Sequence, residues 1–274
     1  MQNNKPIWFE DKTTTANDDT YQTIKHNKVE SNTVEINIGQ EPKAKIMVCT
    51  PCHSDVSMHY TQAVLKFQME CMKQGILVSF SLLKSSLVTQ GRNLCVAEFL
   101  NHKDHYDYLL FIDSDIDFNA KTIFKMIGAD KDIIACPYPM KMFDTDRMWK
   151  KIHKTDMVKT EKDLLPSGYM YPIKIDKNEL ILDNGIMEVT HAPTGCMLIK
   201  RTVIEKLIEK HPELETKRYF GEDFGFCQRW TDLGGKVYIY AMDYITHVGE
   251  HAYCGRFFDQ LEAFKRVDVD KKIK

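Results

Sequence analysis

The chain has 274 residues, of which 43% are hydrophobic and 28% charged, with a formal net charge of −2 at pH 7. This length and composition suit one large globular domain with an accessory segment. The near-neutral balance excludes a global basic field that would attract nucleic acid. No apolar run approaches the ~18 residues that span a bilayer, and residues 1–19 lack an apolar signal core. We therefore expect a cytoplasmic protein without a transmembrane segment.

The eight cysteines are scattered along the chain. This spacing is more typical of reduced thiols in a cytosolic protein than of a disulfide framework. Residues Cys49–His53 match the haem-attachment string, but no export signal accompanies them. A zinc site would need a second Cys or His pair at ligand spacing, and none is obvious.

Strands and helices are predicted to alternate between residues 45 and 136. Strands are expected at 45–50, 76–83, 108–113 and 132–136, and helices at 59–73, 92–100 and 120–127. Pro51 is expected to end the first strand and Gly75 the first helix. This alternation predicts an α/β fold with a mostly parallel sheet and helices on both faces.

The alternation breaks at residues 137–185, where we expect an inserted hairpin or a mobile loop. Further on, the pattern predicts strand, turn and strand at 187–200, helices at 203–210 and 219–233, and a last strand at 236–240, followed by the segment 245–249. As domains, we expect a polar and partly disordered leader at 1–40, a single domain at 41–250 with an inserted loop at 141–185, and a C-terminal extension at 251–274.

The stretch Tyr108–Phe118 organises the rest of the chain. It begins with an uninterrupted apolar run, typical of a strand buried on both faces, and continues with Asp113, Asp115 and Asp117. Open α/β sheets bind ligands at the carboxyl ends of their strands. Carboxylates two residues apart there can turn oxygens toward one hard cation. An acidic turn is the alternative, because Asp and Ser favour turns.

Two further sites lie at the ends of predicted elements. Glu222 and Asp223 open a helix, where the helix dipole favours acidic residues, so capping is an alternative to chemistry. His247 follows a strand and precedes Gly249. A histidine in this position can be a metal ligand, but a hydrogen-bonded surface residue is the commoner case.

Together and in this order, these sites resemble the glycosyltransferases of the GT-A fold, particularly the large inverting family. Phe111-Ile112-Asp113-Ser114-Asp115 resembles the Asp-x-Asp signature of that family. Glu222-Asp223, within Gly221–Trp230, resembles its Glu-Asp acceptor-side motif. The similarity covers roughly residues 44–250 and implies a GT-A type, Rossmann-like fold.

The resemblance implies a nucleoside diphosphate sugar as donor, with a UDP-sugar favoured, and Mn²⁺ or Mg²⁺ as cofactor. Asp115 would ligate the ion directly. Asp113 would bind the ribose, or the metal through water, with Ser114 beside it in the donor motif. His247 lies where some members of the family supply a further metal ligand. Such an ion neutralises charge on the leaving diphosphate.

Other residues have roles implied by the same resemblance. Thr50 and Pro51 lie where the base and ribose usually rest, and Asp223 would be the general base. Glu222 would bind the acceptor. Arg92 opens a helix and could reach the base or a phosphate, or lie on the surface. The turn at 193–196 could admit a sugar ring or be a plain hairpin, and Trp230 is expected in the core.

Two rival functions share these features. A nucleotidyltransferase acting on a sugar phosphate would usually have a loop with Gly and Lys or Arg after the first strand, whereas this chain has Thr-Pro-Cys-His-Ser-Asp at 50–55. A non-catalytic module that binds sugar or nucleic acid is the other alternative. The acceptor could be a glycan, a protein, a lipid or a modified DNA base. Stereochemistry and oligomeric state are also left open.

Residues 141–159 carry six basic residues against three acidic ones. The basic residues are Lys141, Arg147, Lys150, Lys151, Lys154 and Lys159. Cations interleaved with aromatic residues suit a polyanionic acceptor. The alternative is a solvated loop that closes over the donor as a lid.

Overall fold

The computed structural model describes residues 41–154, 158–175, 182–210 and 222–263. The chain divides into two units, Met1–Glu41 and Pro42–Lys274. All the named helices and strands belong to the second unit. The expected leader at 1–40 and the end of the expected extension, 264–274, lie outside the described residues.

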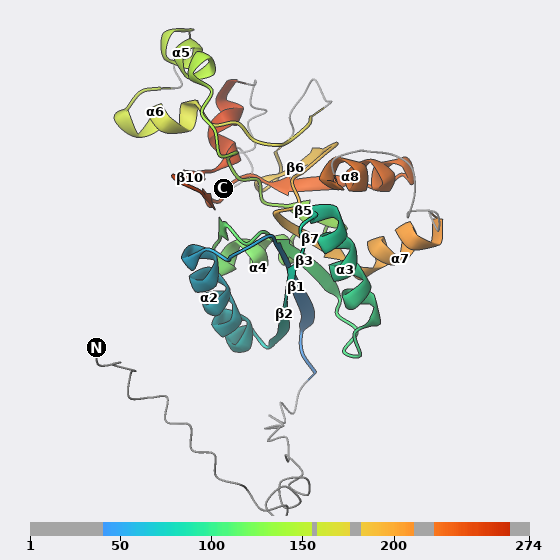
Figure 1. Cartoon of the computed structure of the whole chain (residues 1–274). Helices are drawn as coiled ribbons and strands as arrows, with labels where there is room; N and C mark the ends of the chain where they lie inside the picture. The colour runs from blue at the N-terminus through green and yellow to red at the C-terminus, as the bar shows by residue number, and fades with distance from the viewer. Residues whose placement is uncertain (1–40, 155–157, 176–181, 211–221, 264–274) are drawn as a thin grey trace, which may run out of the picture. The chain divides into compact units, whose positions relative to one another are not determined.

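A seven-stranded sheet forms the centre of the unit, in the order β2-β1-β3-β7-β5-β8-β6 (Figure 1). In that order the strands are Ile76–Lys84, Ala44–Cys52, Tyr108–Ile112, Cys196–Lys200, Ile133–Ala135, Val237–Tyr240 and Ile186–Val189. β1 pairs in parallel with β2 and β3, and β5 with β8. β7 is antiparallel to β3 and β5, and β6 to β8. The mostly parallel α/β architecture is thus confirmed.

Helices cover both faces of the sheet (Figure 1). Their bounds are Met58–Gln74 (α2), Val88–Asn101 (α3), Ala120–Gly128 (α4), Arg201–Lys210 (α7) and Glu222–Asp232 (α8). On one face, Phe67 of α2 and Ile123 of α4 pack in a core with Leu110 of β3. On the other face, Phe99 of α3 and Trp230 of α8 pack in a second core with Leu109. Burial of adjacent strand residues on opposite faces explains the uninterrupted apolar run, and Trp230 is in the core as predicted.

Local signals predicted most element ends within a few residues. Gly75 ends α2 in the left-handed region, at φ 70°. Two boundaries differ from expectation. β1 continues through Pro51, which lies beyond Cys49, the last residue paired with β3, so the proline interrupts no ladder on that side. α3 begins at Val88 rather than Arg92, with Gly91 inside the helix, where a Cβ would come 3.0 Å from that of Pro51.

A second sheet holds three short strands in the order β10-β9-β4, which are Ala252–Gly255, Ile245–Val248 and Ile116–Asp117. Ile116 lies opposite His247 in the antiparallel β4–β9 pair. Since β4 begins directly after Asp115, this register brings His247 to the acidic loop that follows β3.

The insertion contains two helices, α5 (Thr145–Lys154) and α6 (Glu161–Ser167). The hairpin prediction is therefore wrong for its centre, although Phe143 and Tyr169 form an antiparallel bridge at its base. Gln260, in the 3₁₀ helix Phe257–Ala263, ties the two helices together. Its Oε1 accepts from Lys151 and Arg147, and its Nε2 donates to the Pro166 carbonyl at 2.9 Å.

The plain hairpin considered for the turn at 193–196 is also wrong. β7 lies between β3 and β5, whereas β6 pairs with β8 at the far edge of the sheet. The turn therefore carries the chain from one part of the sheet to another. Over the described ranges, no helix is both long and apolar enough to cross a membrane.

Candidate functional site

The acidic loop at the carboxyl end of β3 is held by main-chain hydrogen bonds from three directions. The bonds run from Asp113 N–H to Gly195 O at 3.0 Å, from Ser57 N–H to Ser114 O at 2.8 Å, and from Val248 N–H to Asp115 O at 2.8 Å. They connect the loop to the turn before β7, to the start of α2 and to the end of β9. Asp113 and Asp115 are thus presented from a braced loop.

Asp113 forms an ion pair with Arg92. The arginine Nη2 lies 2.9 Å from Asp113 Oδ1. Arg92 is 7% exposed, and its guanidinium stacks over the Phe111 ring at 5.0 Å from the ring centre. The alternative that placed Arg92 on the surface is wrong, because the residue is part of the core directly beneath the acidic loop.

Tyr138 and Gly195 complete this half of the site. A Cβ at Gly195 would overlap both the Tyr138 hydroxyl and Asp113 Oδ2, so these groups require a glycine between them. Burial raises the pKa of Tyr138 well above its usual value, and the charges of Asp113 and Asp223 raise this pKa further, against the opposing effect of Arg92. Tyr138 was not among the residues predicted for the site. Its position just after β5, at the carboxyl edge of the sheet, was the available signal.

Asp115 forms the other half of the site with His247 and Lys141. His247 Nε2 lies 3.4 Å from Asp115 Oδ2, and the Lys141 ammonium forms an ion pair with the same oxygen. His247 Nδ1 lies 2.9 Å from the Pro139 carbonyl oxygen, to which it donates. Nε2 therefore faces the carboxylate. Burial alone would raise the pKa of Asp115, but the hydrogen bonds from His247 and Lys141 outweigh it, so the pKa is lowered and the carboxylate stays ionised.

Asp117 does not join the other two carboxylates. Its nearest basic partner is His59 of α2, with 3.9 Å between His59 Nδ1 and Asp117 Oδ2, and both side chains are more than 40% exposed. The three predicted carboxylates thus separate into Asp113 with Arg92, Asp115 with His247, and a partly exposed Asp117 near His59.

Thr50 and Pro51 are placed for packing. Thr50 is fully buried, and its hydroxyl lies 2.6 Å from that of Tyr60. Pro51 packs against Gly91, one residue before Arg92 in α3. Thr50 thus contacts α2, whereas Pro51 contacts α3, and the Thr50 hydroxyl is directed to Tyr60 rather than to solvent.

Asp223 lies in the first turn of α8, where its Oδ1 accepts from the Phe224 N–H at 2.8 Å. Its effect on the pKa of Tyr138 places its charge in the same region as Asp113 and Arg92. The side chain of Glu222 and the whole of Gly221 lie outside the described residues.

The donor atoms fit a metal ion only in part. In the portion of the chain described here, no three or more His, Cys, Asp or Glu residues group as a self-sufficient metal site. Asp115 and His247 offer one oxygen and one nitrogen. A hard divalent ion is commonly held by one or two protein ligands, with phosphates and water completing its shell. The pair therefore suits an ion shared with a phosphate-bearing ligand.

All eight cysteines are free thiols.

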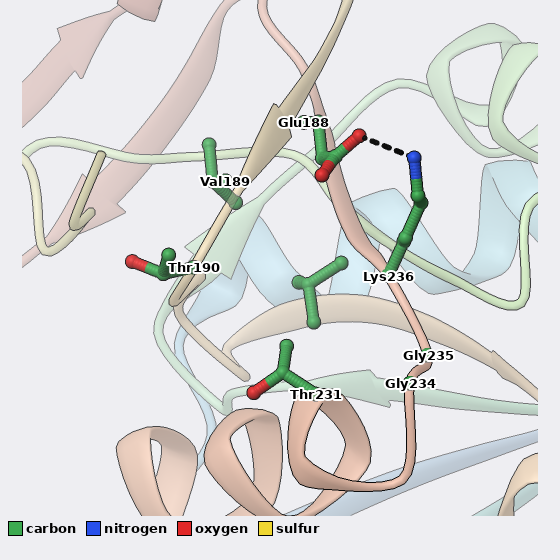
Figure 2. A pocket seen from close by; sticks show the side chains of 8 residues that line it. Glu188, Val189, Thr190, Thr231, Gly234, Gly235 and Lys236 are labelled. Atoms are coloured by element: carbon green, nitrogen blue, oxygen red, sulfur yellow. Dashed lines mark hydrogen bonds and ion pairs between the residues drawn. The ribbon is translucent and has the colours of Figure 1, made fainter. Parts of the chain in front are cut away.

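A separate hollow of about 340 Å³ lies at the opposite end of β8 (Figure 2). Its lining includes Glu188 of β6 and Lys236 before β8, whose charged groups are 3.0 Å apart, and Thr231 of α8. None of the residues predicted for the functional site lines this hollow.

No family model matches the chain, and no curated protein matches it. Among solved structures, the crystal structure of A197 from STIV is similar to it. The two chains are 19% identical, the similarity covers 75% of this chain and 86% of that one, and the TM-score is 0.44.

Proposed function

We propose that this protein is a GT-A type glycosyltransferase that moves a sugar from a nucleoside diphosphate sugar to an acceptor hydroxyl. The observation that carries the proposal is the braced loop after β3, with Asp113 paired to a buried Arg92 and Asp115 paired to His247. Two carboxylates with separate, oriented partners at the carboxyl edge of a mostly parallel sheet suit a nucleotide ligand. A UDP-sugar is the favoured donor.

Mn²⁺ or Mg²⁺ is the proposed cofactor, with Asp115 and His247 as its protein ligands. When bound, the ion would neutralise charge that develops on the leaving diphosphate. The hydrogen bond from His247 Nδ1 to the Pro139 carbonyl, 2.9 Å long, supports this role, because such a bond fixes the ring and leaves Nε2 for the ligand side.

Asp113 and Arg92 would position the donor. Their ion pair fixes one Asp113 oxygen, while the other lies beside Gly195 and Tyr138. The glycine at position 195 leaves room for the Tyr138 hydroxyl beside this second oxygen of Asp113. Asp113 would thus present a fixed acceptor to ribose hydroxyls.

Asp223 is the proposed general base that takes the proton from the acceptor hydroxyl, and Glu222 would bind the acceptor. A positioned base commonly contributes ~10²–10⁴-fold to turnover. A carboxylate base acting on the acceptor suits inversion at the sugar carbon. The charge of Asp223 acts on Tyr138 and so lies near the proposed donor site.

The test compares Asp115→Asn with Asp117→Asn, a matched control two residues further along the chain, where the carboxylate is partly exposed and lies near His59. Nucleotides and nucleotide sugars of uracil, guanine and cytosine are screened by thermal shift with and without Mn²⁺, because a bound ligand raises apparent stability. The wild type and Asp117→Asn should show a Mn²⁺-dependent shift with one nucleotide series. Asp115→Asn should lose it and keep its fold.

Slow hydrolysis of the selected nucleotide sugar then separates the rival functions. Release of free sugar by the wild type supports transfer, whereas binding without turnover favours a non-catalytic module. Pyrophosphate release from a nucleoside triphosphate and a sugar phosphate would indicate a nucleotidyltransferase. The absence of any nucleotide-dependent shift in the wild type would contradict the proposal.

A further inference from the structure

One oxygen of Asp115 is shared by two basic side chains. His247 Nε2 lies 3.4 Å from Oδ2, and Lys141 Nζ forms an ion pair with the same atom. His247 belongs to β9, whereas Lys141 belongs to the segment before α5. Asp115 Oδ2, which faces His247 Nε2, is therefore already paired with a cation, the Lys141 ammonium.

An ammonium and a divalent ion cannot easily share this oxygen. Their like charges repel at contact distance, and the Asp115 side chain is only 32% exposed, so solvent screens the repulsion incompletely. Lysine carries a compact charge on a flexible four-carbon stem. The Lys141 ammonium can consequently leave Asp115 without a movement of the main chain.

The aliphatic part of the Lys141 side chain packs against Gly249. A Cβ at position 249 would lie 3.0 Å from Lys141 Cδ and 3.5 Å from Cε. These atoms belong to a flexible side chain, so an alanine at position 249 would displace the lysine rather than the main chain. Gly249 thus offers a second way to weaken the Lys141–Asp115 pair without removing the charge.

We propose that Lys141 occupies the cation position of Asp115 in the free protein and yields it to a divalent ion, after which its ammonium meets a phosphate of the donor. This inference rests on the proposed function both for the divalent ion at Asp115 and for the phosphate that receives the lysine. The exchange keeps Asp115 neutralised before the ion arrives. It also makes ion binding weak until a phosphate is present to receive the lysine.

The test measures Mn²⁺ binding to the full chain by calorimetry, at neutral pH, with no nucleotide present. Lys141→Met should bind Mn²⁺ at least about fivefold more tightly than the wild type, within the usual range for coupling between two binding events. Gly249→Ala should shift affinity in the same direction. Lys150→Met, an exposed lysine of the same insertion, should match the wild type, and adding Asp115→Asn to Lys141→Met should remove binding.

Mn²⁺ binding by Lys141→Met that equals or is weaker than that of the wild type overturns the inference. The absence of Mn²⁺ binding in both the wild type and Lys141→Met also overturns it, because removing the lysine would then open no cation site. If Lys141→Met fails to fold, the comparison of Gly249→Ala with the wild type decides in the same way. Failure of the proposed function is a separate result, since it appears as the absence of nucleotide binding by the wild type.

Discussion

At the scale of single residues, position 195 has no room for a side chain. A Cβ there would overlap the Tyr138 hydroxyl and Asp113 Oδ2. Tyr138 is buried and Asp113 is held by Arg92, so neither can retreat freely. Gly195→Ala should therefore lower the free energy of unfolding by about 1–3 kcal/mol, the usual cost of overpacking, and should weaken donor binding. Denaturant unfolding and nucleotide titration measure the two effects.

The matched control for this prediction is Gly128→Ala at the end of α4. A Cβ at Gly128 meets no atom within 4 Å. Alanine should be neutral there or stabilise by up to about 1 kcal/mol, because it restricts the unfolded chain. Equal stability of Gly195→Ala and the wild type would contradict the crowding argument.

Residue identities singled out the carboxylates of the loop but not all of their partners. Asp113 and Asp115 were recognised because alternate carboxylates follow an apolar run. His247 and Arg92 were also named as site candidates, but the ion pairs of Arg92 with Asp113 and of Lys141 with Asp115 were not predicted, because no local pattern shows that these distant residues meet the loop. That Asp117 lies apart from Asp113 and Asp115 was not predicted either, because it too depends on contacts that are distant in sequence.

At the scale of elements, the insertion shows how nonlocal contacts override a local pattern. Residues 141–185 are polar and contain Pro166 and Gly168, which argued for a loop. α5 and α6 form nonetheless, because Asp144 accepts from the Arg147 N–H at the start of α5 and Gln260 joins the two helices. Gln260 is about a hundred residues from α5, and the helical periodicity of the insertion gives no sign of it. By contrast, the alternating elements between β1 and β5 carry local signals and were predicted closely.

Lys151 gives the insertion a measurable pH dependence. The residue is 8% exposed, and burial, with the nearby charge of Arg147, lowers its pKa to about 8. In the unfolded chain a lysine pKa is about 10.4. Between these values the unfolded state binds the proton and the folded state does not. The free energy of unfolding should therefore rise with pH in this window, by at most about 1.4 kcal/mol per pH unit.

Urea unfolding of the wild type and Lys151→Met between pH 7 and pH 10 measures this contribution, since other groups titrate equally in both proteins. Below pH 8 the cost of burying the charge is fully present, so Lys151→Met should gain most there relative to the wild type. Lys150→Met should keep the wild-type profile. Parallel profiles for Lys151→Met and the wild type would show that burial of this charge is not linked to folding.

At the scale of the whole molecule, strand alternation predicted the fold class but not the order of the sheet. Alternation of strands and helices favours parallel pairing, and β1, β2 and β3 follow it. The antiparallel insertion of β7 between β3 and β5 could not be predicted, because pairing across long separations leaves no periodic trace. This insertion is what brings Gly195 to Asp113, so the least predictable part of the topology also shapes the site.

The net charge of the chain affects whether it can bind a polyanionic acceptor. The net charge of −2 means that attraction of a polyanion would depend on the insertion. There, Lys151 is buried against Gln260, Arg147 bonds to the same side chain, and Lys141 pairs with Asp115. Lys151 is 8% exposed and therefore offers little surface to a polyanion. Exposed Lys150 is the better probe, and we expect a neutral glycan or a protein hydroxyl as acceptor.

The measurement is fluorescence anisotropy of a single-stranded DNA oligonucleotide, the polyanion probe, titrated with the full chain from low to high salt. We expect binding that is weak and nearly flat with salt, because few phosphates can be neutralised. Tight binding whose logarithm falls steeply with the logarithm of salt, with a slope that shrinks by about 1 in Lys150→Ala, would instead indicate phosphate contacts by the insertion. Asp117→Asn, which alters charge outside the insertion, should leave that slope unchanged and so separates a local contact from a change in net charge.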